Sequence, residues 1–554
     1  MKLKAHSLRL QKKTLAFALI PTFIFGLAMS VGHSIDKTGE LELKSASFWI
    51  MFLAAWLVAA LFLFFLLCLC DQESSLCDQE RKLSKKLKSR TKTGLGSYLL
   101  TCLLLFLCWI PVFLAEYPGF FVYDATDEYV EVATRTFNTH HPLLHVLMLG
   151  GSVCGGNKLF GSINVGIAIY TVLQMAVMAA IFAWIVNECK TRCGYVLSLL
   201  WYGFFPTVVM FVLCSAKDTL FVAALLVSVI LTTKLFNEFK LNHLIVLALS
   251  LCLMMLFRNN GVYAFLVYAV VVCVYVTIHT DKARRLKTAL LLVGMALAIL
   301  ATYKITDAVL VSVTRASDIE NQEILTVPIQ QVARTWSVYR DEMNQEELDT
   351  LYEVLPENVL AHYTPNLSDP VKAGFDNEMY ARNPAKYRKL WWDLFKKHSG
   401  SYLNAWLNTC VGFFYPGTVI NVYAGHEVYT FTYTESSYFG YEVEYPGERV
   451  SIIPIIDRFY RWISLDDDIQ KTPILHLLFS MGAMFWLYVL FAIVLLYKKR
   501  GNEILVGLTL PGAVWLTLLL GPTYLPRYTV FLWFMLPWII KEVYAVCVVQ
   551  KENC

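Results

Sequence analysis

The sequence has few charged residues for its length. Of its 554 residues, 16% are Asp, Glu, Lys or Arg and 57% are hydrophobic, whereas soluble globular proteins have about 25% charged residues. This shortage of charge excludes the ordinary soluble enzyme classes and predicts a chain that lies mostly in a bilayer. The 47 basic and 43 acidic residues leave a net charge of +4, which excludes the strongly basic surface that a nucleic-acid partner requires.

The cysteines lack the spacing of a disulfide framework or a zinc site. There are 14 of them, and several stand inside apolar runs, for example Cys68, Cys102 and Cys252. In such surroundings cysteine behaves as a small buried hydrophobic residue. The sequence therefore predicts neither structural disulfides nor structural zinc.

Apolar runs long enough to cross a hydrocarbon core of roughly 30 Å as helices recur along the chain. We expect about twelve of them, with eleven or thirteen as alternatives, and an all-α polytopic fold. The expected spans are 14–32, 47–70, 97–115, 163–187, 195–213, 219–233, 243–257, 261–278, 288–307, 472–497, 503–520 and 528–547.

The distribution of basic residues predicts the orientation. With both termini in the cytoplasm, 24 Lys and Arg residues fall in cytoplasmic segments and 7 in the short outer loops, as the positive-inside rule requires. The basic segment 71–96 is then cytoplasmic. Because no cleavage pattern follows the first apolar run, we expect it to be a retained anchor.

Two expected outer regions are too long to be simple connections, 116–162 and 308–471. The second is acidic and contains amphipathic helical patterns, which predict a small outer-face domain. Its aromatic stretch 401–417 is expected to be an interfacial helix. The predicted division of the chain is 1–96 for two spans and a basic linker, 97–307 for the core bundle, 308–471 for the outer domain and 472–554 for the last spans.

The loop 116–162 has the densest cluster of ionisable residues. Asp124 follows the aromatic run FFVY, which should hold the backbone at the membrane interface and partly desolvate the carboxylate, so that it can act as a general base. Asp127 and Glu128 follow three and four positions later and would share a face with Asp124 in a helix. Each carboxylate taken alone is also explained as a solvated loop residue.

Three histidines follow in the run HHPLLH: His140, His141 and His145. Pro142 suits the first turn of a helix, so His141 would lie at an electropositive helix start that can bind a phosphate oxygen. A metal site made by His140, His145 and the carboxylates is an open alternative, although no HExxH-like spacing supports it. If Asp124, Asp127 and Glu128 hold an ion, their oxygen atoms favour Mg²⁺ or Mn²⁺.

Three polar insertions interrupt the outer ends of apolar helices. They contain Lys217 and Asp218 in AKD, Arg258 and Asn259 in RNNG, and Arg527 in GPTYLPRY. Each alone is explained by snorkelling or capping. Because the predicted topology puts all three on the side of 116–162, we expect them to surround a cleft that binds an anionic phosphate or diphosphate.

These motifs resemble those of the GT-C superfamily of polytopic glycosyltransferases. The shared features are an Asp in the first long outer loop, a His-Pro motif before the next helix and a large outer region before the last spans. The strings HHPLLH, AKDTLF, RNNG, VPIQQVAR, DPVK and GPTYLPRY are similar to those of a group of uncharacterised multi-pass membrane proteins, mostly of Gram-positive bacteria, near that superfamily. The resemblance covers about 97–550. The superfamily often has two adjacent carboxylates, which here are Asp127 and Glu128, whereas Asp124 stands alone.

The resemblance implies an inverting transfer of a sugar from a polyprenyl-phosphate donor to an outer cell-envelope glycan, lipid or protein. Asp124 would be the general base, with Asp127 and Glu128 as alternatives. The expected donor-phosphate ligands are Arg258, His141, Lys217 and Arg527, and the other site candidates are His140, His145, Asp218 and Asn259. No cofactor is required by this chemistry, and Mg²⁺ or Mn²⁺ remains an option.

Two other functions are compatible with the sequence. A transporter or flippase for an anionic lipid-linked precursor is the first alternative, although transport sites usually lie near the bilayer midplane between repeated halves and no repeat is visible here. The second is a catalytically silent protein whose aromatic stretch 423–445 stacks on an outer polymer.

Overall fold

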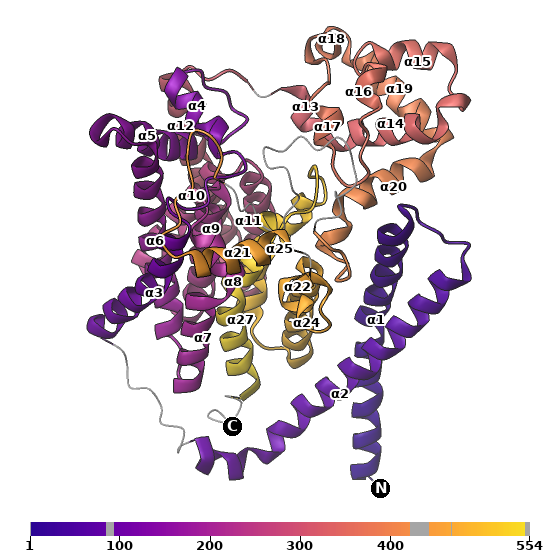
Figure 1. The fold of residues 1–554 in the computed structure, drawn as a ribbon. Helices are drawn as coiled ribbons and strands as arrows, with labels where there is room; N and C mark the ends of the chain where they lie inside the picture. Colours follow the sequence, from indigo (N-terminus) through magenta and orange to yellow (C-terminus); the bar gives the residue numbers. More distant parts are fainter. Residues whose placement is uncertain (1, 85–93, 319, 421–442, 467, 549–554) are drawn as a thin grey trace.

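The computed structural model describes residues 2–84, 94–318, 320–420, 443–466 and 468–548 (Figure 1). In these ranges the chain forms helices and four isolated β-bridges but no strand, which confirms the all-α class. Most of the proposed sugar-stacking stretch 423–445 lies outside the described residues.

Among the described residues, ten helices are long and apolar enough to cross a membrane, or eleven if a bent pair counts as one span. The ten are α1 (Lys2–Thr38), α2 (Ala46–Ser84), α3 (Leu95–Ala115), α5 (Leu143–Phe160), α6 (Ile163–Asn187), α9 (Lys217–Asn237), α11 (Gly261–His279), α12 (Arg285–Thr314) extended by η1 (Lys282–Arg284), α24 (Met481–Lys498), and α26 (Pro526–Thr529) with α27 (Phe531–Val548). The multi-pass helical character is therefore confirmed.

The count differs from twelve because of a few particular helices. The expected span 195–213 is the bent pair, α7 (Arg192–Phe204) and α8 (Pro206–Val212), at 58° to each other. Proline cannot continue the preceding helical hydrogen bonds, so the break comes at Pro206. Two other expected spans are α10 (Leu241–Phe257) and α25 (Asn502–Leu518), with 17 residues each, slightly short of the length required.

One of the ten apolar helices, α5, lies inside the region 116–162, for which we expected no span. Ser97 at the start of α3 donates to Asn187 at the end of α6 at 3.0 Å, and Thr171 near the start of α6 donates to the carbonyl of Pro118 after α3 at 3.1 Å. The two helices are thus antiparallel, and the segment between them begins and ends at the same end of the bundle. Both α5 and α4 (Ala125–Thr134) lie at that end (Figure 1).

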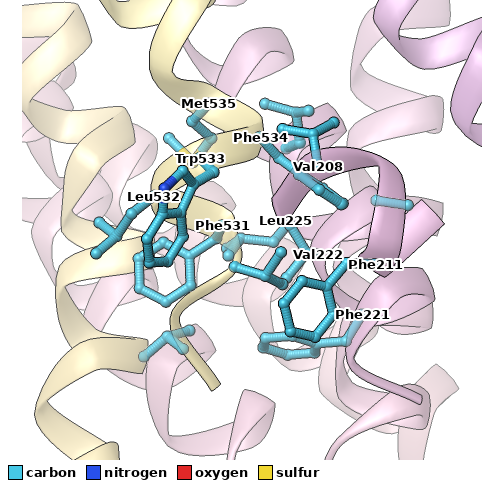
Figure 2. Packing of buried hydrophobic residues seen from close by; sticks show 14 of the residues in the cluster. Val208, Phe211, Phe221, Val222, Leu225, Phe531, Leu532, Trp533, Phe534 and Met535 are labelled. Atoms are coloured by element: carbon cyan, nitrogen blue, oxygen red, sulfur yellow. The ribbon is translucent and has the colours of Figure 1, made fainter. Parts of the chain in front are cut away.

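The centre of the bundle is α9, which is apolar on all sides and largely buried, as expected for a helix surrounded by others. It packs against α10, α25 and α27. Figure 2 shows Phe221, Val222 and Leu225 of α9 beside Phe211 of α8 and Phe531 of α27. The polar residues at the ends of α9 are consequently fixed by a tightly packed core.

A second helical unit, here called the helical cap (residues 321–410), lies at the same end of the molecule as α4 (Figure 1). It has its own apolar cluster, which includes Trp336, Leu351 and Leu394, as the amphipathic patterns predicted. Its helices are α13 (Asn321–Ile324), α14 (Thr326–Tyr339), η2 (Arg340–Glu342), α15 (Gln345–Tyr352), α16 (Glu357–Leu360), α17 (Asp369–Lys372), α18 (Asn377–Arg382), α19 (Pro384–Lys397) and α20 (Ser399–Cys410).

The stretch 401–417, which we expected to be an interfacial helix, is mostly helical. It contains most of α20 and the turn η3 (Val411–Phe413). Tyr402 is 1% exposed and donates to the carbonyl of Trp391 at 2.8 Å, while Trp406 donates to the carbonyl of Leu519 at 2.7 Å. The stretch therefore fastens the helical cap to the bundle. The remaining helices are α21 (Pro454–Leu465), α22 (Asp468–Lys471) and α23 (His476–Phe479).

Candidate active site

Asp124 is the residue that precedes α4. An Asp in this N-cap position usually accepts hydrogen bonds from the first turn of its own helix. Here it makes no such bond. Its carboxylate instead accepts a hydrogen bond from Nζ of Lys217, the first residue of α9, at 2.6 Å, and the same oxygen lies 3.5 Å from Nη1 of Arg527.

These two cations determine the charge of Asp124. Burial alone would raise the pKa of this carboxyl, but the charges of Arg527 and Lys217 outweigh burial and hold the pKa well below its usual value. Asp124 is therefore a carboxylate throughout the physiological pH range. While these pairs are intact, it is a weak base.

A second carboxylate and a second arginine complete the cluster. Asp218 is 1% exposed and pairs with Arg258, whose guanidinium lies over the rings of Tyr528, at 5.1 Å, and Phe221, at 5.7 Å. Nε of Arg527 is 3.9 Å from the other oxygen of Asp218. Arg527 thus lies between the two carboxylates, as a planar guanidinium can.

The cluster lies beside a pocket that two of its members, Lys217 and Arg258, line, and it has a surplus of positive charge. Lys217, Arg258 and Arg527 supply three cations against the two carboxylates. The pocket beside them has a volume of about 230 Å³, and its wall includes His140, Lys217, Arg258, Asn259 and Tyr528. The predicted convergence of the three polar insertions is thus found. The arrangement can bind a small polar group that carries negative charge.

The two adjacent histidines lie on the same side. His141 is 5% exposed, and its Nδ1 is 3.0 Å from Nζ of Lys217. Burial and the charge of Lys217 hold the pKa of His141 well below its usual value, so the ring is neutral and its Nδ1 accepts a hydrogen bond from the ammonium. The following helix, α5, begins at Leu143, as the His-Pro motif predicted. Nδ1 of His140 lies 3.7 Å from the carboxylate of Glu323 in the helical cap.

Glu128 is directed away from Asp124, so the expected common face of all three carboxylates is wrong, whereas burial and the nearby charge of Asp124 raise the pKa of Asp127. Glu128 is 1% exposed and pairs with Nδ1 of His145, whose Nε2 is 2.7 Å from the hydroxyl of Tyr170. This pair fastens α4 to α5 and α6. Asp127 is exposed. The reason is that α4 begins only at Ala125, so that Asp124 precedes the helix and its side chain leaves in another direction.

The chain matches a family described as a family of unknown function, DUF6020, over residues 131–543. It belongs to this family. No curated protein and no solved structure matches the chain. The part matched to DUF6020 contains Lys217, Arg258 and Arg527 and begins seven residues after Asp124.

The carboxylates expected to hold Mg²⁺ or Mn²⁺ are dispersed in this DUF6020 member. Among the described residues, no group of three or more His, Cys, Asp or Glu side chains is arranged to hold a metal ion. Asp124, Asp127 and Glu128 have the three different environments described above.

Several residues around the pocket were not found from the sequence of this DUF6020 chain. The rings of Tyr123 and Tyr528 lie 4.5 and 4.8 Å from the Arg527 guanidinium, and Nδ2 of Asn260 donates to Thr517 at 2.8 Å. Tyr528 directly follows Arg527 in the GPTYLPRY motif, and this adjacency could have indicated that it lies near the site. Asn260 and Thr517 are 257 positions apart in the sequence, and no local pattern connects them.

Proposed function

We propose that the protein is a membrane glycosyltransferase of the GT-C type that moves a sugar from a polyprenyl-phosphate donor to an outer cell-envelope acceptor. The observation that carries the proposal is the contact of Asp124 with Lys217 and Arg527 beside a pocket with surplus positive charge. A donor of this class has an apolar chain in the bilayer and a phosphate at its surface. A cationic pocket at the end of a bundle of apolar helices matches both parts.

The proposed transfer is a single displacement. The oxygen of an acceptor hydroxyl attacks the anomeric carbon of the donor, and the bond from that carbon to the phosphate oxygen breaks with inversion of configuration. Asp124 takes the hydroxyl proton. The polyprenyl phosphate leaves with the electron pair of the broken bond, and Arg258 and Lys217 stabilise its negative charge.

The ion pairs of Asp124 suggest an order of binding. A donor phosphate competes with Asp124 for Lys217 and Arg527, and each cation that turns to the phosphate raises the basicity of the carboxylate. Asp124 then becomes an effective base only when the donor is present. This order suppresses proton abstraction in the absence of a sugar to transfer.

Twelve crossings, with both termini in the cytoplasm, complete the proposed architecture. The helices α10 and α25 are included because 17 residues extend about 25 Å. Arg258, just after α10, pairs with Asp218 at the start of α9, so α10 extends along the length of α9. We exclude α5 because α3 and α6 are antiparallel, so the segment between them begins and ends at the same end of the bundle. The number of membrane crossings is then even, as two termini on the same side of the membrane require.

Labelling of introduced cysteines tests this topology. Asn358 in the helical cap and Ala283 between α11 and α12 are both exposed. In a variant without native cysteines, we expect Asn358→Cys to react with an impermeant maleimide in intact cells. The Ala283→Cys site should react only after permeabilisation. The reverse result would invert the proposed orientation.

The function is tested with purified protein in lipid nanodiscs and a radiolabelled polyprenyl-phosphate hexose or pentose. Transfer predicts release of polyprenyl phosphate and a labelled acceptor, and mass spectrometry of cells without the gene should show accumulated donor lipid and a missing sugar branch. A transporter would instead move the intact lipid between leaflets of a vesicle without releasing polyprenyl phosphate. Failure of every hexose and pentose donor, with intact movement between leaflets, would replace the proposal by that alternative.

A further inference from the structure

A segment distant in sequence runs along the loop that precedes Asp124. This segment, here called the strap (residues 443–453), lies beside residues 114–126. The backbone N–H of Val450 donates to the carbonyl of Tyr117 at 2.9 Å, and that of Glu444 donates to the carbonyl of Phe121 at 2.8 Å. The strap therefore supports the backbone on which Asp124 stands.

The residue before Asp124 has an uncommon backbone conformation. Tyr123 has a φ of 65°, in the left-handed region that bulky L-residues rarely adopt. Surrounding contacts must hold it there. The N–H of Tyr123 donates to Oε1 of Glu444 at 3.0 Å, and its ring lies against Arg527.

The same carboxylate binds on the other side of Asp124. The hydroxyl of Thr126, in the first turn of α4, lies 3.1 Å from Oε2 of Glu444 and 2.6 Å from the carbonyl oxygen of Tyr445 in the same strap. Glu444 is 7% exposed. Its two oxygens therefore hold the residue before Asp124 and the second residue after it. Glu444 also supplies negative charge at the start of α4, which an N-cap side chain would normally do.

We propose that Glu444 is a positioning residue that keeps the carboxylate of Asp124 out of the helix cap and directed toward Lys217. Without Glu444, Tyr123 is free to return to negative φ, and Asp124 can turn back to cap α4. The ion pair with Lys217 is then lost. The consequence for sugar transfer rests on the proposed function, but the effect on the ion pair does not.

Acylation of Lys217 measures this effect without any transfer assay. An ammonium that donates to a carboxylate is shielded from acylation, so labelling of Lys217 in the full-length protein, quantified by peptide mass spectrometry, reports the pair. We expect Asp124→Asn to increase this labelling severalfold and Glu444→Ala to increase it nearly as much. Glu448→Ala is the matched control, because Glu448 is an exposed residue of the same strap, and it should label as the wild type does.

Two further variants separate positioning from a general loss of structure. Glu444→Gln keeps an acceptor for the N–H of Tyr123, so it should restore most of the protection of Lys217. Thr126→Val removes the hydroxyl that contacts Glu444 and the carbonyl of Tyr445 but leaves the hydrogen bond from the N–H of Tyr123, so it should have an intermediate effect. Both variants remain informative if Glu444→Ala does not fold. Labelling of Lys217 at the wild-type level in folded Glu444→Ala or, failing that variant, in Thr126→Val overturns the inference.

The transfer assay then distinguishes the inference from the proposed function. If transfer occurs, the acid limb of its pH profile should move toward the ordinary Asp range in Glu444→Ala, because Asp124 loses the cations that lower its pKa. A smaller folded fraction would reduce the rate without moving this limb. Changed labelling of Lys217 without transfer by the wild type would retain the positioning role and reject the glycosyltransferase.

Discussion

Two ion clusters lie at opposite ends of the same helices, and they differ in charge balance. One end of α9 carries Lys217 and the other end carries Lys234, which pairs with Glu188. Lys541 of α27 donates to the same glutamate at 2.8 Å and lies 2.9 Å from Glu542. This distal cluster (Glu188, Lys234, Lys541 and Glu542) has two cations and two carboxylates.

The cluster around Asp124 has one more cation than carboxylates and lies beside a pocket. Yet in both clusters two cations lower the pKa of a carboxylate. Burial would raise the pKa of Glu188, but Lys541 and Lys234 lower it, as Arg527 and Lys217 do for Asp124. A lowered pKa therefore does not by itself distinguish a binding site from a structural ion pair. Surplus charge and adjacent space make the distinction.

The sharpest test of this comparison removes one carboxylate from each cluster. We expect Asp124→Asn to reduce the transfer rate by about 10²- to 10⁴-fold, the usual loss with a general base, while the protein remains folded and monodisperse. Glu188→Gln should keep the rate per folded molecule within about twofold of wild type, since it changes a distal contact. Initial rates in nanodiscs measure both.

Two outcomes of that pair of variants would contradict the assignment. Wild-type turnover by Asp124→Asn would remove Asp124 as the base and direct attention to Asp127. Equal losses in the two variants would show that both clusters act only through the fold.

Stability should respond in the opposite way. Glu188→Ala leaves Lys234 and Lys541 without their shared partner, and breaking a buried ion pair costs about 3–5 kcal/mol. Because the side chain of Glu188 is 21% exposed, we expect about 2 kcal/mol, measured by denaturation in detergent. The control is Glu238→Ala, whose exposed partner Lys240 should make the loss less than about 1 kcal/mol. Equal losses would show that the distal cluster does not fasten the helices.

A conservative exchange of cations compares the clusters again. The Arg258 guanidinium packs over Tyr528 and donates to Asp218, and a lysine cannot reproduce both contacts. We expect Arg258→Lys to weaken donor affinity about tenfold, or about 1.4 kcal/mol, with near-normal expression. Lys234→Arg in the distal cluster should leave donor affinity unchanged. Unchanged donor binding and turnover in Arg258→Lys would remove this arginine from the site.

The helical fold was largely predictable because the length of an apolar run is a local property of the chain. The span expected at 219–233 is found in α9, Lys217–Asn237. A helix was expected after Pro142, but its length and apolar character were not, because the 18 residues of α5 contain four glycines and a lysine. Gly156 allows α5 to pack closely against α6, because a Cβ at this position would lie 2.3 Å from Cα of Gly166 in α6. Such close packing depends on two segments together.

The site was predictable only in part. The convergence of Lys217, Arg258 and Arg527 followed from topology, because the alternation of spans puts all three at one end of the bundle. The partners of the carboxylates did not follow. Whether Glu128 faces the pocket or His145 depends on the residue at which α4 begins, and sequence patterns fix helix boundaries poorly. Glu444 lies 320 positions after Asp124, so no spacing indicates its role.

The smallest expected effect concerns pH and contrasts Glu188 with Glu131 of α4. Glu131 accepts a hydrogen bond from the N–H of Asn138 at 3.3 Å, and the charge of Lys217 lowers its pKa less than burial raises it. Burial, with a further contribution from Glu128, raises its pKa from 4.5 to about 7. The folded protein therefore holds this proton more tightly than the unfolded chain does. Ionisation of Glu131 destabilises the fold, with a cost that is absent below about pH 4.5 and complete above about pH 7.

We therefore expect Glu131→Gln to match the wild type in thermal stability near pH 4.5 and to exceed it at pH 8. The midpoint shift per kcal/mol is roughly 2–4 °C for 150–250 residues and falls as the chain gets longer, so in this 554-residue chain the gain should be at most a few degrees. Glu188→Gln must show the opposite trend, because cations lower the pKa of Glu188: its deficit relative to the wild type is complete above about pH 4.5 and shrinks as the pH falls through the lowered pKa. Thermal melts of the three proteins in one detergent across this range measure both slopes. Parallel curves for Glu131→Gln and the wild type would show that Glu131 ionises as freely in the folded protein as in the unfolded chain.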